Sequence, residues 1–208
     1  MIHVKGLSLK IKKDRILSDV NLYIKKGKIT GLVGRNGCGK TMLIKCITGF
    51  VKPTEGKVIF DGKVVNEDVD FPANTGIIIE APDFVPCYSG IKNLMELARL
   101  QRKIGKTEVE EVLKKVGLYK DRNKAVRKYS LGMRQRLGIA QALMENPNTL
   151  ILDEPMNGLD NEGVALIRGI LMELRGQGKT ILIVSHNVED IRILCDEIYE
   201  MDKGRIVM

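Results

Sequence analysis

Gly34-Arg35-Asn36-Gly37-Cys38-Gly39-Lys40-Thr41 is the stretch of this 208-residue sequence that decides the fold. It follows the apolar segment 28–33, an expected strand, and leads into the apolar segment 41–50, an expected helix. The pattern G-x-x-x-x-G-K-[ST] between a strand and a helix is typical of a phosphate-binding loop. Its glycines let the main chain wrap closely, so that successive N–H groups and the helix N-terminus point at a phosphate.

The side chains of this loop predict a nucleoside triphosphate as its ligand. Lys40 is expected to reach the β- and γ-phosphates, and Thr41 to offer its hydroxyl to Mg²⁺. The loop alone fits a kinase, a GTPase or a transport ATPase equally well, but no N-K-x-D stretch for reading guanine is present. The predicted nucleotide-binding residues are Gly34, Arg35, Asn36, Gly37, Cys38, Gly39, Lys40, Thr41 and Met42.

A second candidate site lies in Thr149-Leu150-Ile151-Leu152-Asp153-Glu154-Pro155, an apolar strand that ends in two acids. Burying this strand leaves its acids at the carboxyl edge of the sheet, where open α/β folds bind ligands. Asp153 is expected to hold Mg²⁺, through water, and Glu154 to orient or deprotonate the attacking water. The alternative is an acidic strand end that only caps the next turn.

Hydrophobic periodicity predicts an α/β protein whose parallel core is interrupted by helices and then resumed. An antiparallel β portion is expected at the N-terminus. The predicted strands are 2–12, 20–25, 28–33, 57–60, 76–80, 149–152, 180–184, 197–201 and 205–208, and the predicted helices are 41–50, 91–102, 107–116, 131–145 and 161–175.

The domain organisation follows from this pattern. With no internal repeat and no linker-like tract, residues 1–208 are expected to form a single domain. Its core lobe takes in about 1–81 and 147–208, and its helical lobe about 82–146.

Composition narrows the range of functions. The chain is 44% hydrophobic and 29% charged, and its longest apolar runs have the length of a strand. A bilayer span needs roughly 20 apolar residues, so we expect a cytoplasmic protein that meets membranes only through a partner. The net charge of +8 is concentrated in residues 1–28 and 99–128. Such clusters suit nucleic acid, anionic lipid or an acidic partner, or are simply solvated, and nine aromatic residues provide little for stacking on bases.

Further motifs complete a pattern that covers essentially the whole chain. Tyr129-Ser130-Leu131-Gly132-Met133-Arg134-Gln135-Arg136 resembles the L-S-G-G-Q signature of ABC transporter ATP-binding subunits. Asn157-Gly158-Leu159-Asp160 resembles the D-loop of that family, and Ser185-His186 its switch histidine. Together with the phosphate loop and 150–155, these motifs follow the order found in the family. The resemblance implies a P-loop NTPase core of the RecA-like type with an inserted helical lobe.

The resemblance also implies an activity and partners. ATP and Mg²⁺ are the implied cofactors, and Glu154, His186 and Lys40 the implied catalytic residues. Two cassettes of such a family close head to tail, so that the signature of one meets the ATP of the other. A second cassette, identical or different, and a separate membrane permease are therefore implied. The signature residues are Ser130, Leu131, Gly132 and Met133, and Asp160 acts across the subunit boundary.

Three positions depart from the family pattern. The signature has Leu131 and Met133 where Gly and Gln are usual, although Ser130 is a good helix N-cap. Glu80 replaces the usual glutamine after the strand 76–79; it is a candidate Mg²⁺ ligand or else a solvated strand end. Ile11 stands near the position of the aromatic residue that commonly stacks on adenine.

Glu80 and the altered signature together resemble the branch that exports bacitracin-type or lantibiotic peptides for self-protection. The predicted function is an ATP-hydrolysing motor of an ABC transporter, acting on a permease at the inner face of the membrane. Phe84, Val85 and Tyr88 are candidate permease contacts, or else core residues. The alternative is a soluble ABC ATPase acting on ribosomes or nucleic acid, which the single compact cassette makes the weaker prediction.

Overall fold

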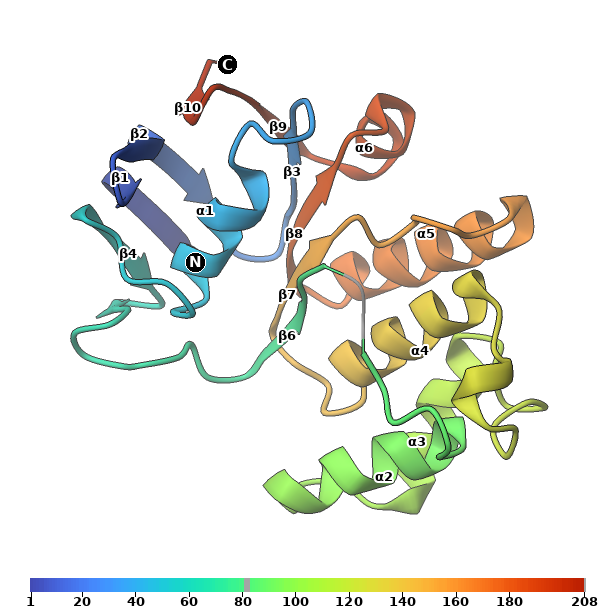
Figure 1. The fold of residues 1–208 in the computed structure, drawn as a ribbon. Helices are drawn as coiled ribbons and strands as arrows, with labels where there is room; N and C mark the ends of the chain where they lie inside the picture. Colours follow the sequence, from blue (N-terminus) through green and yellow to red (C-terminus); the bar gives the residue numbers. More distant parts are fainter. Residues whose placement is uncertain (81–82, 208) are drawn as a thin grey trace.

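The computed structural model describes residues 1–80 and 83–207. The strands within them are β1 (Ile2–Ile11), β2 (Asp14–Ile24), β3 (Ile29–Val33), β4 (Glu55–Phe60), β5 (Lys63–Val64), β6 (Thr75–Ile78), β7 (Thr149–Asp153), β8 (Thr180–Ser185), β9 (Glu197–Asp202) and β10 (Arg205–Ile206) (Figure 1). The helices are α1 (Lys40–Ile47), α2 (Gly90–Gln101), α3 (Lys106–Lys115), the 3₁₀ helix η1 (Val126–Lys128), α4 (Leu131–Leu143), α5 (Asn161–Gly176) and α6 (Val188–Leu194).

The central sheet has the strand order β10-β9-β3-β8-β7-β6. Strands β9, β3, β8, β7 and β6 run parallel, and β10 pairs antiparallel with β9. Every residue of β7 and β8 is buried, as expected for parallel strands that are covered on both faces. Leu150 and Leu152 pack on the helical side of the sheet, and Ile151 on the opposite side.

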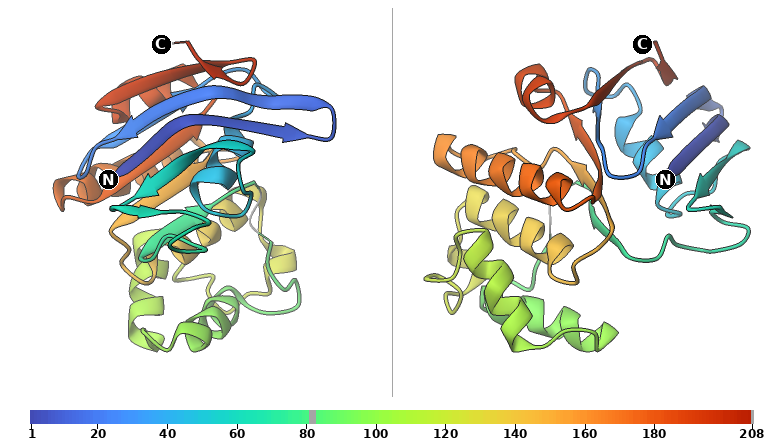
Figure 2. Two further views of the ribbon diagram at one scale, coloured as in Figure 1. Left: turned by 90° about the vertical axis from the view of Figure 1, so that its left-hand side faces the viewer. Right: turned by 180° about the vertical axis from the view of Figure 1, so that it is seen from behind.

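A second, antiparallel sheet in the order β2-β1-β4-β5 covers one face of the central sheet. Its long β1–β2 hairpin extends beyond the other strands (Figure 2). Helix α1 lies between the two sheets, where Leu43, Ile44 and Ile47 are fully buried. The mostly parallel sheet with an antiparallel N-terminal portion confirms the predicted fold class.

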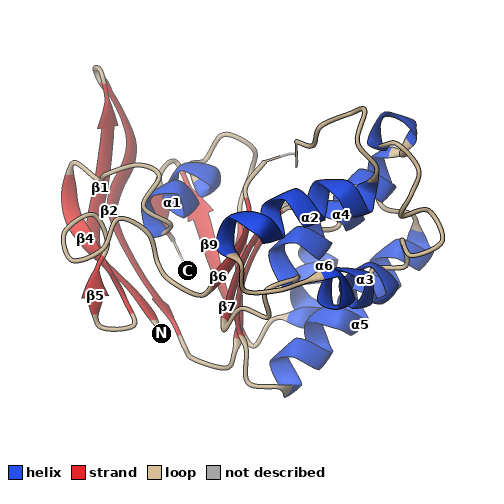
Figure 3. Ribbon diagram, turned by 90° about the horizontal axis from the view of Figure 1, so that it is seen from below, coloured by secondary structure: helices blue, strands red, loops and turns tan. Residues whose placement is uncertain are grey.

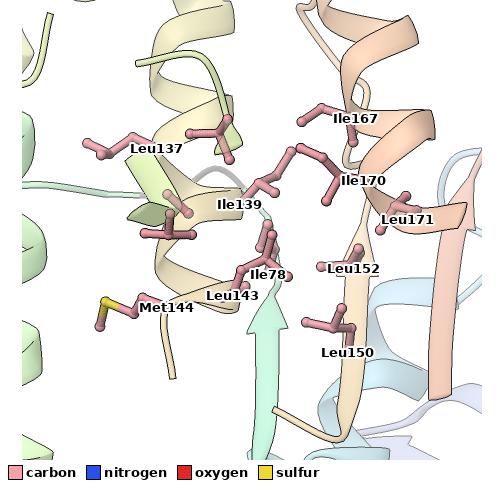
Figure 4. Packing of buried hydrophobic residues seen from close by; sticks show 14 of the residues in the cluster. Ile78, Leu137, Ile139, Leu143, Met144, Leu150, Leu152, Ile167, Ile170 and Leu171 are labelled. Carbon is pink, nitrogen blue, oxygen red and sulfur yellow. The ribbon is translucent and has the colours of Figure 1, made fainter. Parts of the chain in front are cut away.

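Helices α2 to α6 cover the other face, so that strands and helices separate into layers (Figure 3). Side chains of α4 and α5 converge there on Ile78, Leu150 and Leu152 of the sheet (Figure 4). Helix α4 approaches β6 so closely that a Cβ atom at Gly76 would lie 2.0 Å from the carbonyl oxygen of Ala142. The absence of a side chain at Gly76 therefore sets how tightly this helix packs.

Some predicted boundaries differ from the structure. β2 begins at Asp14, whereas the predicted strand begins at Val20, because the alternation breaks between the buried residues Leu17 and Val20, where Asp19 has a left-handed φ of 49°. The short helix α6 and the two-residue strand β5 were not predicted. The predicted end of the last strand at 208 and the predicted lobe limit at 81–82 lie outside the described residues. The division of the domain into two lobes stays a prediction.

Candidate nucleotide site

The phosphate loop joins the end of β3 to the start of α1. Gly37 and Gly39 have φ values of 79° and 109°, in the left-handed region that favours glycine. A Cβ atom at Gly34 would lie 2.3 Å from the carbonyl oxygen of Met201, so the loop lies directly against β9. This path leaves the N-terminal N–H groups of α1 at the carboxyl edge of the central sheet.

Lys40 folds back over the loop. Its Nζ donates hydrogen bonds to the carbonyl oxygens of Gly34, at 2.6 Å, and Arg35, at 3.0 Å. The residue is buried, with 7% of its surface exposed. Its charge is therefore held inside the curve of the loop, where a phosphate group would also lie.

Thr41 and Asp153 meet at the same edge. The Thr41 hydroxyl donates to Asp153 Oδ2 at 2.9 Å, joining the first turn of α1 to the end of β7. Burial, and the neighbouring charge of Glu154, raise the pKa of Asp153, while the Thr41 hydrogen bond and the Lys40 charge oppose this shift. A buried carboxylate and a hydroxyl are hard oxygen donors, which suit Mg²⁺. The pair thus fits the predicted metal site.

Glu154 is fixed by four contacts with three neighbouring residues. Its backbone has a left-handed φ of 48°, and its N–H donates to the Val184 carbonyl at 2.8 Å. Its Oε1 lies 3.0 Å from the His186 N–H and 2.8 Å from His186 Nδ1. Its Oε2 accepts from the Ser185 hydroxyl at 3.2 Å. The sequence-predicted pair Glu154 and His186 is brought into direct contact at the end of β8.

Gln135 was missed by the sequence analysis as a contributor to this site. Its buried Nε2 donates to the carbonyl oxygens of Glu154, at 3.1 Å, and Pro155, at 3.2 Å. It thereby holds the main chain behind the Glu154 carboxylate. The sequence feature that could have indicated this role is the position of Gln135 on the apolar face of the predicted helix, four residues before Ile139.

Glu80 lies just after β6 with a left-handed φ of 62°. Its carboxylate forms an ion pair with Lys45 of α1, with an Oε1–Nζ distance of 2.6 Å. Lys45 was not predicted to take part in the site. Glu80 nevertheless lines the same pocket as Thr41 and Asp153, and its role as a Mg²⁺ ligand stays a prediction.

A pocket of about 450 Å³ gathers six of the nine predicted nucleotide-binding residues together with Glu80, Asp153 and Glu154. Ile16 and Asn157 join them, although neither was predicted. The pocket is not lined by Gly34, Arg35, Cys38 or His186. Ile11 does not line this pocket and is 43% exposed near the tip of the β1–β2 hairpin. The lining residues are Ile16, Asn36, Gly37, Gly39, Lys40, Thr41, Met42, Glu80, Asp153, Glu154 and Asn157.

The signature residues and Asp160 of the D-loop do not line this pocket, whereas Asn157 of the D-loop does. Ser130 Oγ accepts from the Met133 N–H at 3.2 Å and caps α4, while Leu131 is 56% exposed. A Cβ atom at Gly132 would lie 2.9 Å from the Gly158 carbonyl, so the two motifs pack together. Asp160 Oδ1 accepts from the Gly163 N–H at 2.8 Å and caps α5.

This α/β scaffold combines a phosphate loop, a buried carboxylate beside it, a glutamate at the strand end and a capped signature helix, which is the arrangement of an ATP-binding cassette. The family described as "ABC transporter" matches residues 17–157. The chain belongs to this family: it binds ATP and is an ATPase.

Two curated relatives carry functional names. One, 41% identical over all of this chain and 68% of its own length, is a bacitracin transport ATP-binding protein of Enterococcus faecalis. The other, 37% identical over all of this chain and 90% of its own length, is a lantibiotic transport ATP-binding protein of Streptococcus pyogenes. These similarities confirm the predicted resemblance to the bacitracin and lantibiotic branch.

A solved structure agrees with the fold. It is the dimeric post-hydrolysis state of the ATP-binding cassette MJ0796 bound to ADP and Pi, with a TM-score of 0.90 and 27% identity. The match covers 100% of this chain and 97% of that one. Within residues 1–80 and 83–207 of the present chain, no helix has the length and apolarity of a membrane span.

Proposed function

We propose that this chain is the ATP-hydrolysing subunit of an exporter for bacitracin-like or lantibiotic-like peptides. The single observation that carries the catalytic part is the Glu154 carboxylate, held by Ser185 and His186 beside the phosphate loop. The named relatives support the transport part; they lend no support to the soluble, nucleic-acid alternative.

The phosphate loop would bind the phosphates of the nucleotide, and the carboxyl edge of the sheet would help to hold its Mg²⁺ ion. Lys40 would exchange its contacts with the loop carbonyls for the β- and γ-phosphates, as its 2.6 Å and 3.0 Å bonds lie inside the loop. The Thr41 hydroxyl and Asp153 would hold Mg²⁺. This ion, when bound, neutralises phosphate charge and polarises the phosphate oxygens.

Glu154 and His186 would act on the water. The Ser185 hydroxyl and the His186 main-chain N–H donate to the Glu154 carboxylate, and His186 Nδ1 lies 2.8 Å from it, so the carboxylate is oriented to accept a proton as the water attacks. His186 is exposed, with 57% of its side chain accessible, and would donate to the γ-phosphate. The mechanism therefore uses His186 both to position the base and to contact the ligand.

The second cassette would complete the site. Ser130 and Gly132 lie at the N-terminus of α4, where the positive end of the helix dipole favours an anion. Since they lie outside the pocket of their own chain, they would meet the ATP of the partner. The dimer of the related cassette supports this arrangement.

A groove bordered by β6, α2 and α4 would receive the permease. Its volume is about 720 Å³, and the start of β6 and the ends of α2 and α4 form much of its wall. The apolar side chains of Phe50, Phe71 and Leu100 are 58%, 57% and 79% exposed on its border. The candidate contacts Phe84, which is buried, and Val85 do not line it. Through this contact the chain would lie at the inner face of the cell membrane.

Replacing the proposed base tests the mechanism. Glu154→Gln is expected to bind ATP, form dimers and lose at least about 100-fold in kcat, the usual contribution of general base catalysis. Steady-state phosphate release and size-exclusion chromatography with ATP measure these effects. The exposed Glu67→Gln is the matched control and should keep normal turnover. Near-normal hydrolysis by Glu154→Gln would refute the assigned role.

A further inference from the structure

The carboxylates around the nucleotide pocket outnumber its cations. Glu80, Asp153 and Glu154 line the pocket, whereas Lys40 is the one basic side chain among the described lining residues. An ATP molecule would add further negative charge at this place. A cation from outside the pocket lining would reduce the repulsion among these carboxylates when no metal is bound.

Lys45 provides that cation. It lies four residues after Thr41 on α1, so both side chains project from the same face of the helix, one turn apart. Thr41 contacts Asp153 at 2.9 Å, and Lys45 contacts Glu80 at 2.6 Å. The helix thus places a metal-binding hydroxyl and an ammonium group side by side, each against one carboxylate of the pocket.

The Glu80–Lys45 ion pair is also easily opened. The Glu80 side chain is 63% exposed and that of Lys45 29% exposed, and ion pairs with this exposure contribute little to stability. A divalent cation bound at Thr41 and Asp153 would attract the Glu80 carboxylate more strongly than a single ammonium group does.

We propose that Lys45 is a positioning residue that holds Glu80 away from the metal position, and that Lys45 and Mg²⁺ compete for the Glu80 carboxylate. The ion pair neutralises Glu80 before the nucleotide arrives and releases it when Mg²⁺ is present. This inference rests on the proposed nucleotide and Mg²⁺ site, and it assigns to Lys45 a role in how strongly ATP binding depends on the metal.

Fluorescence titration with mant-ATP, in Mg²⁺ and in EDTA, tests this competition in the hydrolysis-deficient Glu154→Gln protein. The measured quantity is the ratio of the Kd in EDTA to the Kd in Mg²⁺. Lys45→Met is expected to raise this ratio about two- to fivefold, the range of a partly exposed ion pair. Glu80→Gln is expected to lower the ratio, and Lys45→Met in the Glu80→Gln background should change it no further. Lys45→Arg should keep the original ratio.

The exposed Lys57→Met is the matched control, because it removes one positive charge outside the pocket and should leave the ratio unchanged. An unchanged ratio in Lys45→Met, or a change that persists in the Glu80→Gln background, would overturn the proposed competition. Circular dichroism verifies that each variant is folded. If the Glu154→Gln parent bound no mant-ATP in Mg²⁺, the proposed nucleotide site itself would fail, which is a distinct result.

Discussion

At the residue scale, Gln135 is the side chain whose role the sequence analysis missed and the structure makes testable. Gln135→Leu removes the donor of two buried hydrogen bonds to Glu154 and Pro155. The Glu154 carbonyl keeps the Asn157 N–H at 3.1 Å, but the Pro155 carbonyl loses its donor, which is expected to cost about 1–3 kcal/mol of unfolding free energy. Because Glu154 also loses its support, kcat should fall while the affinity for ATP changes little.

Urea unfolding and steady-state ATP hydrolysis measure the two effects separately. Gln101→Leu is the matched control, since Gln101 is exposed at the end of α2, away from Glu154. A Gln135→Leu protein with unchanged kcat would show that the amide supports only the fold. An unchanged unfolding free energy would contradict the structural part of the prediction.

Residue type and spacing were enough to expect Lys40, Thr41, Asp153 and Glu154 close together, because each lies at or beyond the carboxyl end of a strand at the same sheet edge. Gln135 and Lys45 were not predictable in this way. Their roles depend on which side chains the packing of α4 and α1 brings within hydrogen-bonding distance, and local sequence does not encode that. The pocket is lined by Ile16 and not by Ile11. Ile16 lies in the part of β2 that the sequence analysis did not predict as a strand, so its position could not be expected.

At the scale of elements, the groove between α2 and the start of β6 predicts where the permease docks. Leu100→Asp places a charge at an apolar position that is 79% exposed. Binding of the Leu100→Asp chain to the permease is expected to be about tenfold weaker or more, a loss of about 1.4 kcal/mol, which is typical when a residue at the centre of an interface is replaced. The fraction of the chain recovered with native membranes should fall, and hydrolysis by the purified chain should stay normal.

Met172→Asp on α5 is the matched control, because Met172 is 50% exposed and does not line the groove. Equal recovery of the two variants with membranes would argue against docking at this groove. The groove was only partly predictable. The helices around it follow from periodicity, but the exposure of Phe50 and Phe71 depends on the loop that connects β5 to β6.

At the scale of the whole molecule, the order of strands and helices along the chain was enough to predict the fold class. Alternation of apolar strands with helices requires a parallel sheet, and the phosphate loop identifies one of its edges. The two hydrophobic cores, one on each face of the central sheet, could not be assigned from sequence. Strands such as β7 and β8 are apolar at nearly every position, so periodicity does not show which face each residue joins.

These two cores predict how the whole molecule responds to alkaline pH. Burial raises the pKa of the Cys46 thiol from 9.0 to about 12, and burial together with the Asp196 charge does the same for Cys195. Cys46 belongs to the core around α1, and Cys195 packs against the core on the helical side. Both thiols therefore keep their protons in the folded chain at pH values where the unfolded chain has lost them.

The unfolded chain binds fewer protons above pH 9, so the free energy of unfolding should decrease as the pH rises towards 12. The stabilisation is fully present below pH 9, and each thiol contributes a slope that approaches about 1.4 kcal/mol per pH unit. Urea unfolding at pH 8, 9 and 10 under reducing conditions measures this slope. The Cys46→Ala, Cys195→Ala double variant is expected to flatten it, whereas Cys87→Ala, which changes an exposed thiol, should leave it unchanged. If the double variant and the unsubstituted chain showed the same slope, the alkaline loss of stability would come from other groups. Buried Tyr129 would be the first to examine, because burial and the charge of Asp121 raise its pKa to about 12.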